Sequence, residues 1–312
     1  MIKISIANMK GGVGKSTTAM MLADVLSLKH NLEVLVVDCD PQSNLSQMFL
    51  SYSGLKKASA AEKTICHWMQ SKLNSGVNYT LSNTHRSRVS GLVEFKPSNS
   101  FRRQITKGQV GIWPSIPELR FAELAFDHKN FVSADVAQPG RILAEWIKAE
   151  LVEQSRTYDV VIFDCPPGFS TLAQAVIRLS DAIISPVNVD PVSVWSLKQF
   201  WERGLDEFLD LAGQKQRFAL LTMTSRSAGG KDEKLKFRQE LREFAKNGVL
   251  SEEIPFSVQA LRFGRRISLD SHKSFKEKYG KLHLNLERLG KEVESKILKR
   301  EGDVYVEQGR GR

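Results

Sequence analysis

Short runs of aliphatic and β-branched residues alternate with longer amphipathic segments along most of this chain. The short runs are mostly apolar, which is typical of strands buried on both faces of a parallel sheet. The longer segments repeat apolar residues at helical spacing. Strands are predicted at residues 3–7, 32–37, 110–115, 158–164, 182–187, 218–226 (with an exit loop) and 249–257. Strands that alternate with helices in this way predict an α/β fold.

A glycine-rich loop, Met-Lys-Gly-Gly-Val-Gly-Lys-Ser-Thr, separates the first predicted strand from the first predicted helix. Glycines in this position let backbone N–H groups approach phosphates, and the helix N-terminus adds a favourable dipole. Lys15 would supply a point charge, and Ser16 would offer its hydroxyl to Mg²⁺. The predicted nucleotide contacts in this loop are Lys10, Gly11, Gly12, Val13, Gly14, Lys15, Ser16 and Thr17.

The loop departs from the ordinary Gly-x-x-x-x-Gly-Lys-Ser/Thr pattern, because Met9 replaces the first glycine and a second lysine, Lys10, follows it. The sequence Lys-Gly-Gly-x-Gly-Lys-Ser resembles the deviant Walker A motif of the ParA/MinD family of ATPases. Residues 1–50 and 110–260 carry the family's motifs in the family's order. The resemblance implies a doubly wound, mostly parallel sheet with helices on both faces, and ATP and Mg²⁺ as cofactors. It also implies an ATP-bound homodimer in which Lys10 reaches the partner's nucleotide.

Three aspartates follow predicted buried strands, where α/β sheets bind ligands. Asp38 and Asp40 belong to Asp-x-Asp-Pro-Gln-x-Asn, and Asp164 precedes Cys-Pro-Pro. By resemblance, Asp40 positions the attacking water, Asp38 lies near the Mg²⁺ shell, and Asp164 is the Walker B carboxylate that holds Mg²⁺. A plain helix N-cap is the competing interpretation of Asp40. The predicted catalytic residues are Lys10, Lys15 and Asp40, and the predicted metal-site residues are Ser16, Asp38 and Asp164.

The segment Ile-Pro-Phe-Ser-Val at 254–258 resembles the family's Ile-Pro-Arg-Asn-Val, which holds the adenine. The resemblance places Pro255 and Ser257 beside the base. Ser257 stands where relatives carry asparagine and Phe256 where they carry arginine, so the side chains differ from the family pattern.

Basic residues concentrate in two regions of a chain whose formal net charge is +10. Residues 85–107 hold six Lys and Arg against one acidic residue, and residues 256–300 hold twelve against five. Such excess favours contact with polyanions, and phosphate contacts bind DNA without reading its sequence. The candidate DNA contacts are Arg262, Arg265, Arg266, Arg102 and Arg103.

The predicted organisation is a P-loop ATPase domain over 1–275, a C-terminal helix over 276–300 packed on it, and a tail over 301–312. Within that domain, residues 51–110 are a divergent basic insertion, interpreted as an elaborated hairpin with an exposed basic loop. Cysteines 39, 66 and 165 lack metal-ligand spacing and are expected to be reduced thiols. With neither a leader peptide nor an apolar terminal anchor apparent, we expect a cytoplasmic, nucleoid-associated protein and no membrane partner.

The first functional hypothesis is a partition-type ATPase that positions a plasmid, chromosome region or protein cargo with a ParB-like partner. The alternative is an ATP-switched DNA-binding regulator or relaxosome accessory protein of the VirC type. Sequence-specific footprinting would favour the regulator, and uniform coating of DNA would favour the partition ATPase. An electron-transferring iron-protein relative would need paired cluster cysteines, which the spacing does not supply.

Overall fold

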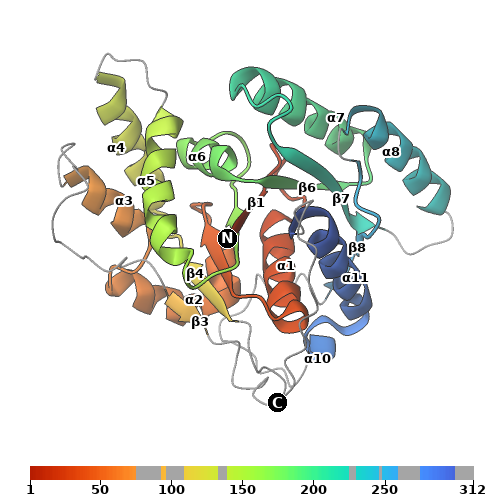
Figure 1. Cartoon of the computed structure of the whole chain (residues 1–312), viewed down its shortest axis with the longest axis horizontal. Coiled ribbons are helices and arrows are strands. Elements are labelled where there is room, and N and C mark those ends of the chain that lie inside the picture. Colours follow the sequence, from red (N-terminus) through yellow and green to blue (C-terminus); the bar gives the residue numbers. More distant parts are fainter. Residues whose placement is uncertain are drawn as a thin grey trace, which may run out of the picture.

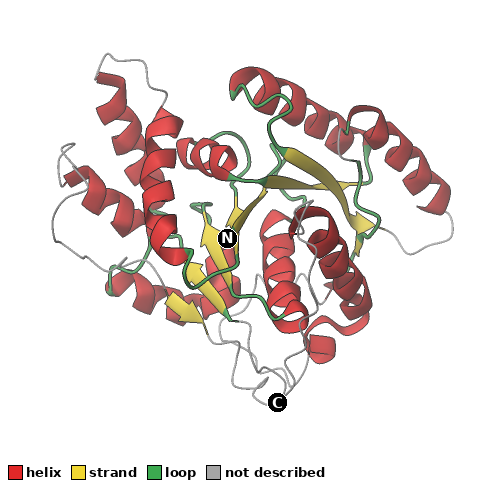
Figure 2. Ribbon diagram, in the orientation of Figure 1, coloured by secondary structure: helices red, strands yellow, loops and turns green. Residues whose placement is uncertain are grey.

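One eight-stranded sheet forms the centre of the computed structural model, which describes residues 1–74, 93–95, 109–132, 139–224, 230–245, 248–258 and 275–298. The strand order is β3-β4-β2-β5-β1-β6-β7-β8. The strands are β1 (Ile2–Ile6), β2 (Val34–Asp38), β3 (Val93–Phe95), β4 (Val110–Trp113), β5 (Val160–Asp164), β6 (Ala182–Asn188), β7 (Gln216–Thr224) and β8 (Ile254–Pro255). Figure 2 shows these strands surrounded by helices.

All neighbouring strands run parallel except β3, which pairs antiparallel with β4 at one edge. This arrangement confirms the expected doubly wound, mostly parallel sheet. β8 is shorter than the predicted strand at 249–257, because its pairing with β7 shifts register between Thr222 and Thr224. Met223 lies between them with φ 54°, a left-handed conformation that interrupts regular pairing. Pro255 also lacks an N–H to continue the ladder.

Helices cover both faces of the sheet. They are α1 (Lys15–His30), α2 (Asn44–Ala60), α3 (Ile65–Asn74), α4 (Leu119–Val132), α5 (Pro139–Gln154), α6 (Thr171–Leu179), α7 (Pro191–Gln199), α8 (Gly230–Phe244), α10 (Phe275–Tyr279) and α11 (His283–Val293). Three short segments continue these helices: the π-helices η2 (Phe200–Phe208) and η4 (Glu294–Leu298) and the 3₁₀ turn η3 (Gly280–Leu282). In Figure 1, α6 and α7 lie on one side of the β1–β6–β7 part of the sheet, and α1 and α11 lie on the other.

The C-terminal helices pack directly on α1, which begins at the glycine loop. Gly290 of α11 lies so close to α1 that a Cβ atom there would come within 2.8 Å of the His30 ring. Asp24 of α1 accepts hydrogen bonds from Lys278 and Tyr279 of α10. The apolar stripe at Leu282, Leu286, Leu289, Val293 and Ile297 is buried. The C-terminal segment therefore supports the helix that presents the loop.

The basic insertion is only partly described. The chain continues from α2 into α3, and β3 returns beside β4 as an antiparallel neighbour. The five candidate DNA-contacting arginines lie outside the described residues. The domain boundaries at 275 and 300 stay predictions. Among the described residues, no helix is both long and apolar enough to cross a membrane.

Candidate functional site

The glycine loop leaves β1 and ends where α1 begins, at the carboxyl edge of the sheet. Gly12 and Gly14 adopt φ angles of 74° and 86°, which side-chain-bearing residues rarely tolerate. A Cβ added at Gly11 or Gly12 would meet no atom within 4 Å, so this side of the loop is open. No side chain caps the N-terminus of α1, and its first turn carries no acidic residue. These N–H groups and the helix dipole are therefore available to an anion.

Lys15 occupies the first turn of α1 and is 7% exposed. Its ammonium group donates to the backbone carbonyl of Lys10 at 2.9 Å. Burial lowers the pKa of Lys15, and the carboxylates of Asp164 and Asp40 oppose that shift. The lysine thus stands as a desolvated cation between the loop backbone and the carboxylates, suited to a phosphate group.

Asp38 and Asp164 end neighbouring strands and are paired in the register of β2 with β5. Both are fully buried, and burial raises the pKa of each, that of Asp38 to about 7. Their hydrogen bonding differs. Asp38 accepts from the Asp40 N–H at 3.1 Å and from the backbone and hydroxyl of Ser46 at 2.8 and 2.6 Å. Both oxygens of Asp38 are therefore already engaged.

Neither carboxylate oxygen of Asp164 has a hydrogen-bond partner among the described residues. The Ser16 hydroxyl lies near enough to lower the pKa of Asp164, while burial and the charge of Asp38 raise it. A buried carboxylate without a partner is costly unless a cation satisfies it. Asp164 and Ser16 together fit Mg²⁺, which takes a few protein oxygens and completes its shell with water and phosphate. The described residues contain no cluster of three or more His, Cys, Asp or Glu suited to a metal.

Asp40 lies on the turn after β2 and is 8% exposed. Its Oδ1 accepts from the Gln42 N–H at 2.8 Å, and the N-cap of α2 is Ser43. The competing interpretation of Asp40 as the N-cap of that helix is therefore wrong. One carboxylate oxygen fixes the turn, which leaves the second able to accept a hydrogen bond from water.

Lys10 reaches from the glycine loop to the start of α7. Its ammonium group donates to the hydroxyl of Ser193 at 2.6 Å and to Oδ1 of Asp190 at 3.2 Å. Asp190 also caps α7, because its Oδ1 accepts from the Ser193 N–H. Hydrogen bonds from Ser193 and Lys10 lower the pKa of Asp190 against its burial. Within a single chain, then, Lys10 is held in an intramolecular contact.

Two buried polar side chains that the sequence did not single out fix the loop from behind. Asn8 accepts from the Lys10 N–H at 3.1 Å and donates to the Pro186 carbonyl of β6 at 2.8 Å. Thr222 of β7 donates to the Val13 carbonyl at 2.9 Å. The loop is therefore tied to two strands that follow it by more than 170 residues. The only local signal for the α7 side of the site was the capping pattern Asp-Pro-Val-Ser at 190–193.

Pro255 and Ser257 lie at the β8 edge, beside the end of β7. Pro255 is buried and Ser257 half-buried, and the Phe256 N–H donates to the Thr224 carbonyl at 3.1 Å. Met223 connects this edge to the loop, since its side chain would lie 3.7 Å from a Cβ at Gly14. The adenine role of both residues stays a prediction.

A family model described as an AAA domain matches residues 1–209. The chromosome partitioning protein ParA of Myxococcus xanthus is 25% identical over 283 residues, covering 87% of this chain and 82% of the relative. A putative replication protein A of Rhizobium rhizogenes is 27% identical over 69% of this chain, and the match spans about half (47%) of that relative. The ATP complex of an McdA variant from Cyanothece shares the fold, with a TM-score of 0.65 at 19% identity over 96% of this chain and 97% of that one.

Proposed function

The chain belongs to the AAA domain family and is a ParA-like member of it, and from this premise we propose that it is an ATPase that dimerises on ATP and partitions DNA or protein cargo. One observation carries the proposal: the open glycine loop and the buried cation of Lys15 face a carboxylate, Asp164, that lacks a partner among the described residues. This combination suits a nucleotide whose phosphates bring their own Mg²⁺.

In this proposal the Gly11–Gly14 backbone and Lys15 bind the β- and γ-phosphates of ATP. Ser16 and Asp164 hold Mg²⁺, which neutralises charge on the phosphates when it is bound. Asp38 acts as a positioning residue, because its oxygens accept from Ser46 and from the Asp40 backbone. The M. xanthus relative is named a partitioning protein and the Cyanothece structure contains ATP, which supports this assignment.

Hydrolysis then needs a positioned water and a compensating positive charge. Asp40 orients the water in line with the γ-phosphate, using the carboxylate oxygen that Gln42 does not engage. Lys10 from a second protomer neutralises the charge that develops in the transition state. A single chain, whose Lys10 is bound to Asp190 and Ser193, would hydrolyse ATP poorly. ATP therefore holds the two protomers together, and its hydrolysis sets the time at which they separate.

The dimer would bind DNA without sequence specificity, through phosphate contacts in the basic regions of the chain. A ParB-like partner would stimulate hydrolysis, and the protein would work in the cytoplasm on the nucleoid. The net charge of +10 supports a polyanionic track.

Retention on immobilised duplex DNA of mixed sequence tests this function. Wild-type protein should be retained with ATP and Mg²⁺, released by salt, and not retained with ADP. Lys10→Ala should abolish the ATP dependence, while Lys198→Ala, on the exposed side of α7, serves as a control for the loss of a lysine. Retention that is insensitive to both ATP and salt would contradict the proposal.

A further inference from the structure

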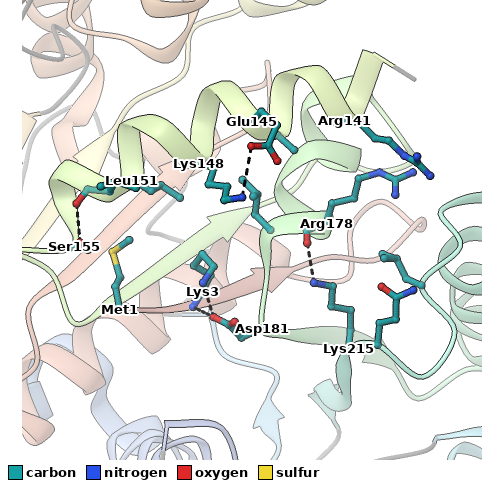
Figure 3. Close-up of a pocket in the computed structure, with 15 residues that line it drawn as sticks. Met1, Lys3, Arg141, Glu145, Lys148, Leu151, Ser155, Arg178, Asp181 and Lys215 are labelled. Atoms are coloured by element: carbon teal, nitrogen blue, oxygen red, sulfur yellow. Dashed lines mark hydrogen bonds and ion pairs between the residues drawn. The ribbon is translucent and has the colours of Figure 1, made fainter. Parts of the chain in front are cut away.

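A cavity of about 700 Å³ opens at the opposite edge of the sheet from the glycine loop. It lies where β1, β6 and β7 begin, and α5 covers one side of it (Figure 3). No step of the proposed ATPase mechanism uses it. Its volume is in the range of pockets that bind small molecules.

The side chains around this cavity are mainly basic. The basic ones are Lys3, Arg141, Lys148, Arg178 and Lys215, and the acidic ones are Glu145 and Asp181. Each acid already faces a lysine: Asp181 accepts from Lys3 at 2.9 Å, and Glu145 lies 3.5 Å from Lys148. Five basic side chains against two acidic ones still leave the lining with an excess of three positive charges.

Neighbouring cations in this lining repel one another: Arg141 repels Arg178, and Arg178 repels Lys215. Figure 3 shows the side chains of Arg141 and Arg178 extending in the same direction from α5 and α6. Burial lowers the pKa of Arg178, and the charge of Arg141 lowers it further, while the charge of Asp210 opposes the shift. Burial likewise lowers the pKa of Lys215, and the charges of Lys3 and Arg178 add to that effect while Asp181 opposes it. A bound anion would relieve this repulsion.

The Arg178 side chain is fixed rather than free to swing away, since its Nη1 donates to the Leu209 carbonyl at 3.0 Å. Lys215 is fixed as well, through a 2.7 Å hydrogen bond to the Arg178 carbonyl. Most of the remaining wall is apolar and is made by Met1, Ala144, Leu151, Val152, Leu179 and Leu211, and the polar Ser155 and Gln214 complete it. A low-dielectric wall beside cations of one sign strengthens their field in the cavity.

We propose that this cavity is a second ligand site, which binds a phosphorylated small molecule of mononucleotide size. The phosphate would lie between the guanidinium groups of Arg141 and Arg178, because planar guanidinium groups match phosphate oxygens in pairs. The base or other apolar body would lie against the wall at Leu151 and Leu211. A concave site of this kind favours a small molecule over duplex DNA, whose backbone would contact only the rim. The site is independent of the ATPase proposal, since it shares no residue with the glycine loop.

Titration calorimetry on the full chain carrying Lys15→Ala tests the site, because that change disables the glycine loop as a competing phosphate site. The probes are AMP and inorganic pyrophosphate. AMP should bind, and bind more tightly than pyrophosphate, which has no apolar body. Adding Arg141→Glu should weaken AMP binding at least about tenfold, since it replaces a phosphate-binding cation by a repelling anion. Arg203→Glu, an exposed arginine of η2 outside the cavity, is the matched control and should leave AMP binding unchanged.

Loss of folding cannot imitate the expected result. Arg141 is exposed, and its replacement by Glu removes a repulsion with Arg178, so the melting temperature should stay equal or rise. AMP binding that Arg141→Glu leaves unchanged overturns the proposal. Equal affinity for AMP and pyrophosphate overturns the assignment of a small molecule with an apolar body. That assignment is also overturned if Arg141→Glu weakens retention on duplex DNA but leaves AMP binding unchanged.

Discussion

The ammonium group of Lys10 lies 3.2 Å from Oδ1 of Asp190, a residue 180 positions further along the chain. Asp190 caps α7 at the same time, so the contact ties the glycine loop to that helix. If Lys10 acts on the nucleotide of a second protomer, this contact must break first. Asp190 then acts as a latch, by which we mean that its ion pair with Lys10 competes with dimer formation. The strength of that ion pair should influence the affinity of the ATP-dependent dimer.

Replacing Asp190 by Asn should favour the dimer. Asparagine keeps the N-cap of α7 but removes the charge that holds Lys10. The ion pair is about one-third exposed on both sides and therefore screened, so its loss should strengthen ATP-dependent dimerisation by only about threefold. Sedimentation velocity with a non-hydrolysable ATP analogue measures the shift. Asp181→Asn, which removes a similarly exposed ion pair with Lys3, is the control; a dimer affinity equal in both variants would contradict the latch.

In the absence of metal, Asp164→Asn and Asp38→Asn should change the free energy of unfolding in opposite directions. Asp164 has no hydrogen-bond partner among the described residues, so Asp164→Asn removes an unfavourable buried charge and should raise the free energy of unfolding by roughly 1 kcal/mol. Asp38→Asn turns an amide N–H₂ toward donors on Ser46 or Asp40 and should lower it by about 1–3 kcal/mol. Urea unfolding in EDTA measures both.

The same pair separates a metal ligand from a positioning residue. Mg²⁺ with ATP should raise the melting temperature of the wild type, and Asp164→Asn should lose the Mg²⁺-dependent part of that rise. Asp38→Asn should retain the Mg²⁺-dependent rise, measured from the lower melting temperature that this variant has without ATP and Mg²⁺. Retention of the full rise by Asp164→Asn would remove Asp164 from the metal site.

The contact between α11 and α1 should be sensitive to one methyl group. Gly290→Ala would bring a Cβ within 2.8 Å of the His30 ring and 3.0 Å of Val25, which should lower the free energy of unfolding by about 1–3 kcal/mol. Gly54→Ala in α2 meets only a 3.3 Å side-chain contact and gains helix propensity, so it should be neutral or slightly stabilising. Thermal unfolding of the two variants gives the comparison. Similar melting temperatures would mean that α11 shifts to make room for the methyl group with no loss of stability, which would contradict the prediction.

The sequence was sufficient for those parts of the site that lie within one motif. Lys15 and Ser16 follow a strand directly, and Asp38 and Asp164 end buried runs, so parallel strands had to bring them to one edge. The sequence could not reveal that Ser46 and the Asp40 backbone engage the two oxygens of Asp38, because both aspartates follow similar apolar runs. Nor could it reveal that Asp164 has no hydrogen-bond partner among the described residues. Only the hydrogen bonds separate their roles.

The residues that support the glycine loop could not be predicted from the sequence, for a different reason. Asn8 bonds to β6, and Thr222 on β7 bonds to the loop at Val13, so both contacts depend on strand order rather than on local pattern. The shortened β8 likewise results from the left-handed backbone at Met223, which no apolar run could indicate. Long-range polar contacts of this kind become visible only when the sheet is assembled.

The role of Lys10 in a second protomer is the central claim, and mixing two inactive variants tests it most directly. Asp40→Ala should form an ATP-bound dimer that does not turn over, and Lys10→Ala should also be inactive. In a mixed dimer, the Lys10→Ala protomer keeps Asp40 and receives Lys10 from its partner. Random mixing at equal amounts should therefore restore about a quarter of wild-type phosphate release, since half of the dimers carry one competent site of two. Recovery to that level supports the account; phosphate release no greater than the sum of the two variants alone would contradict it.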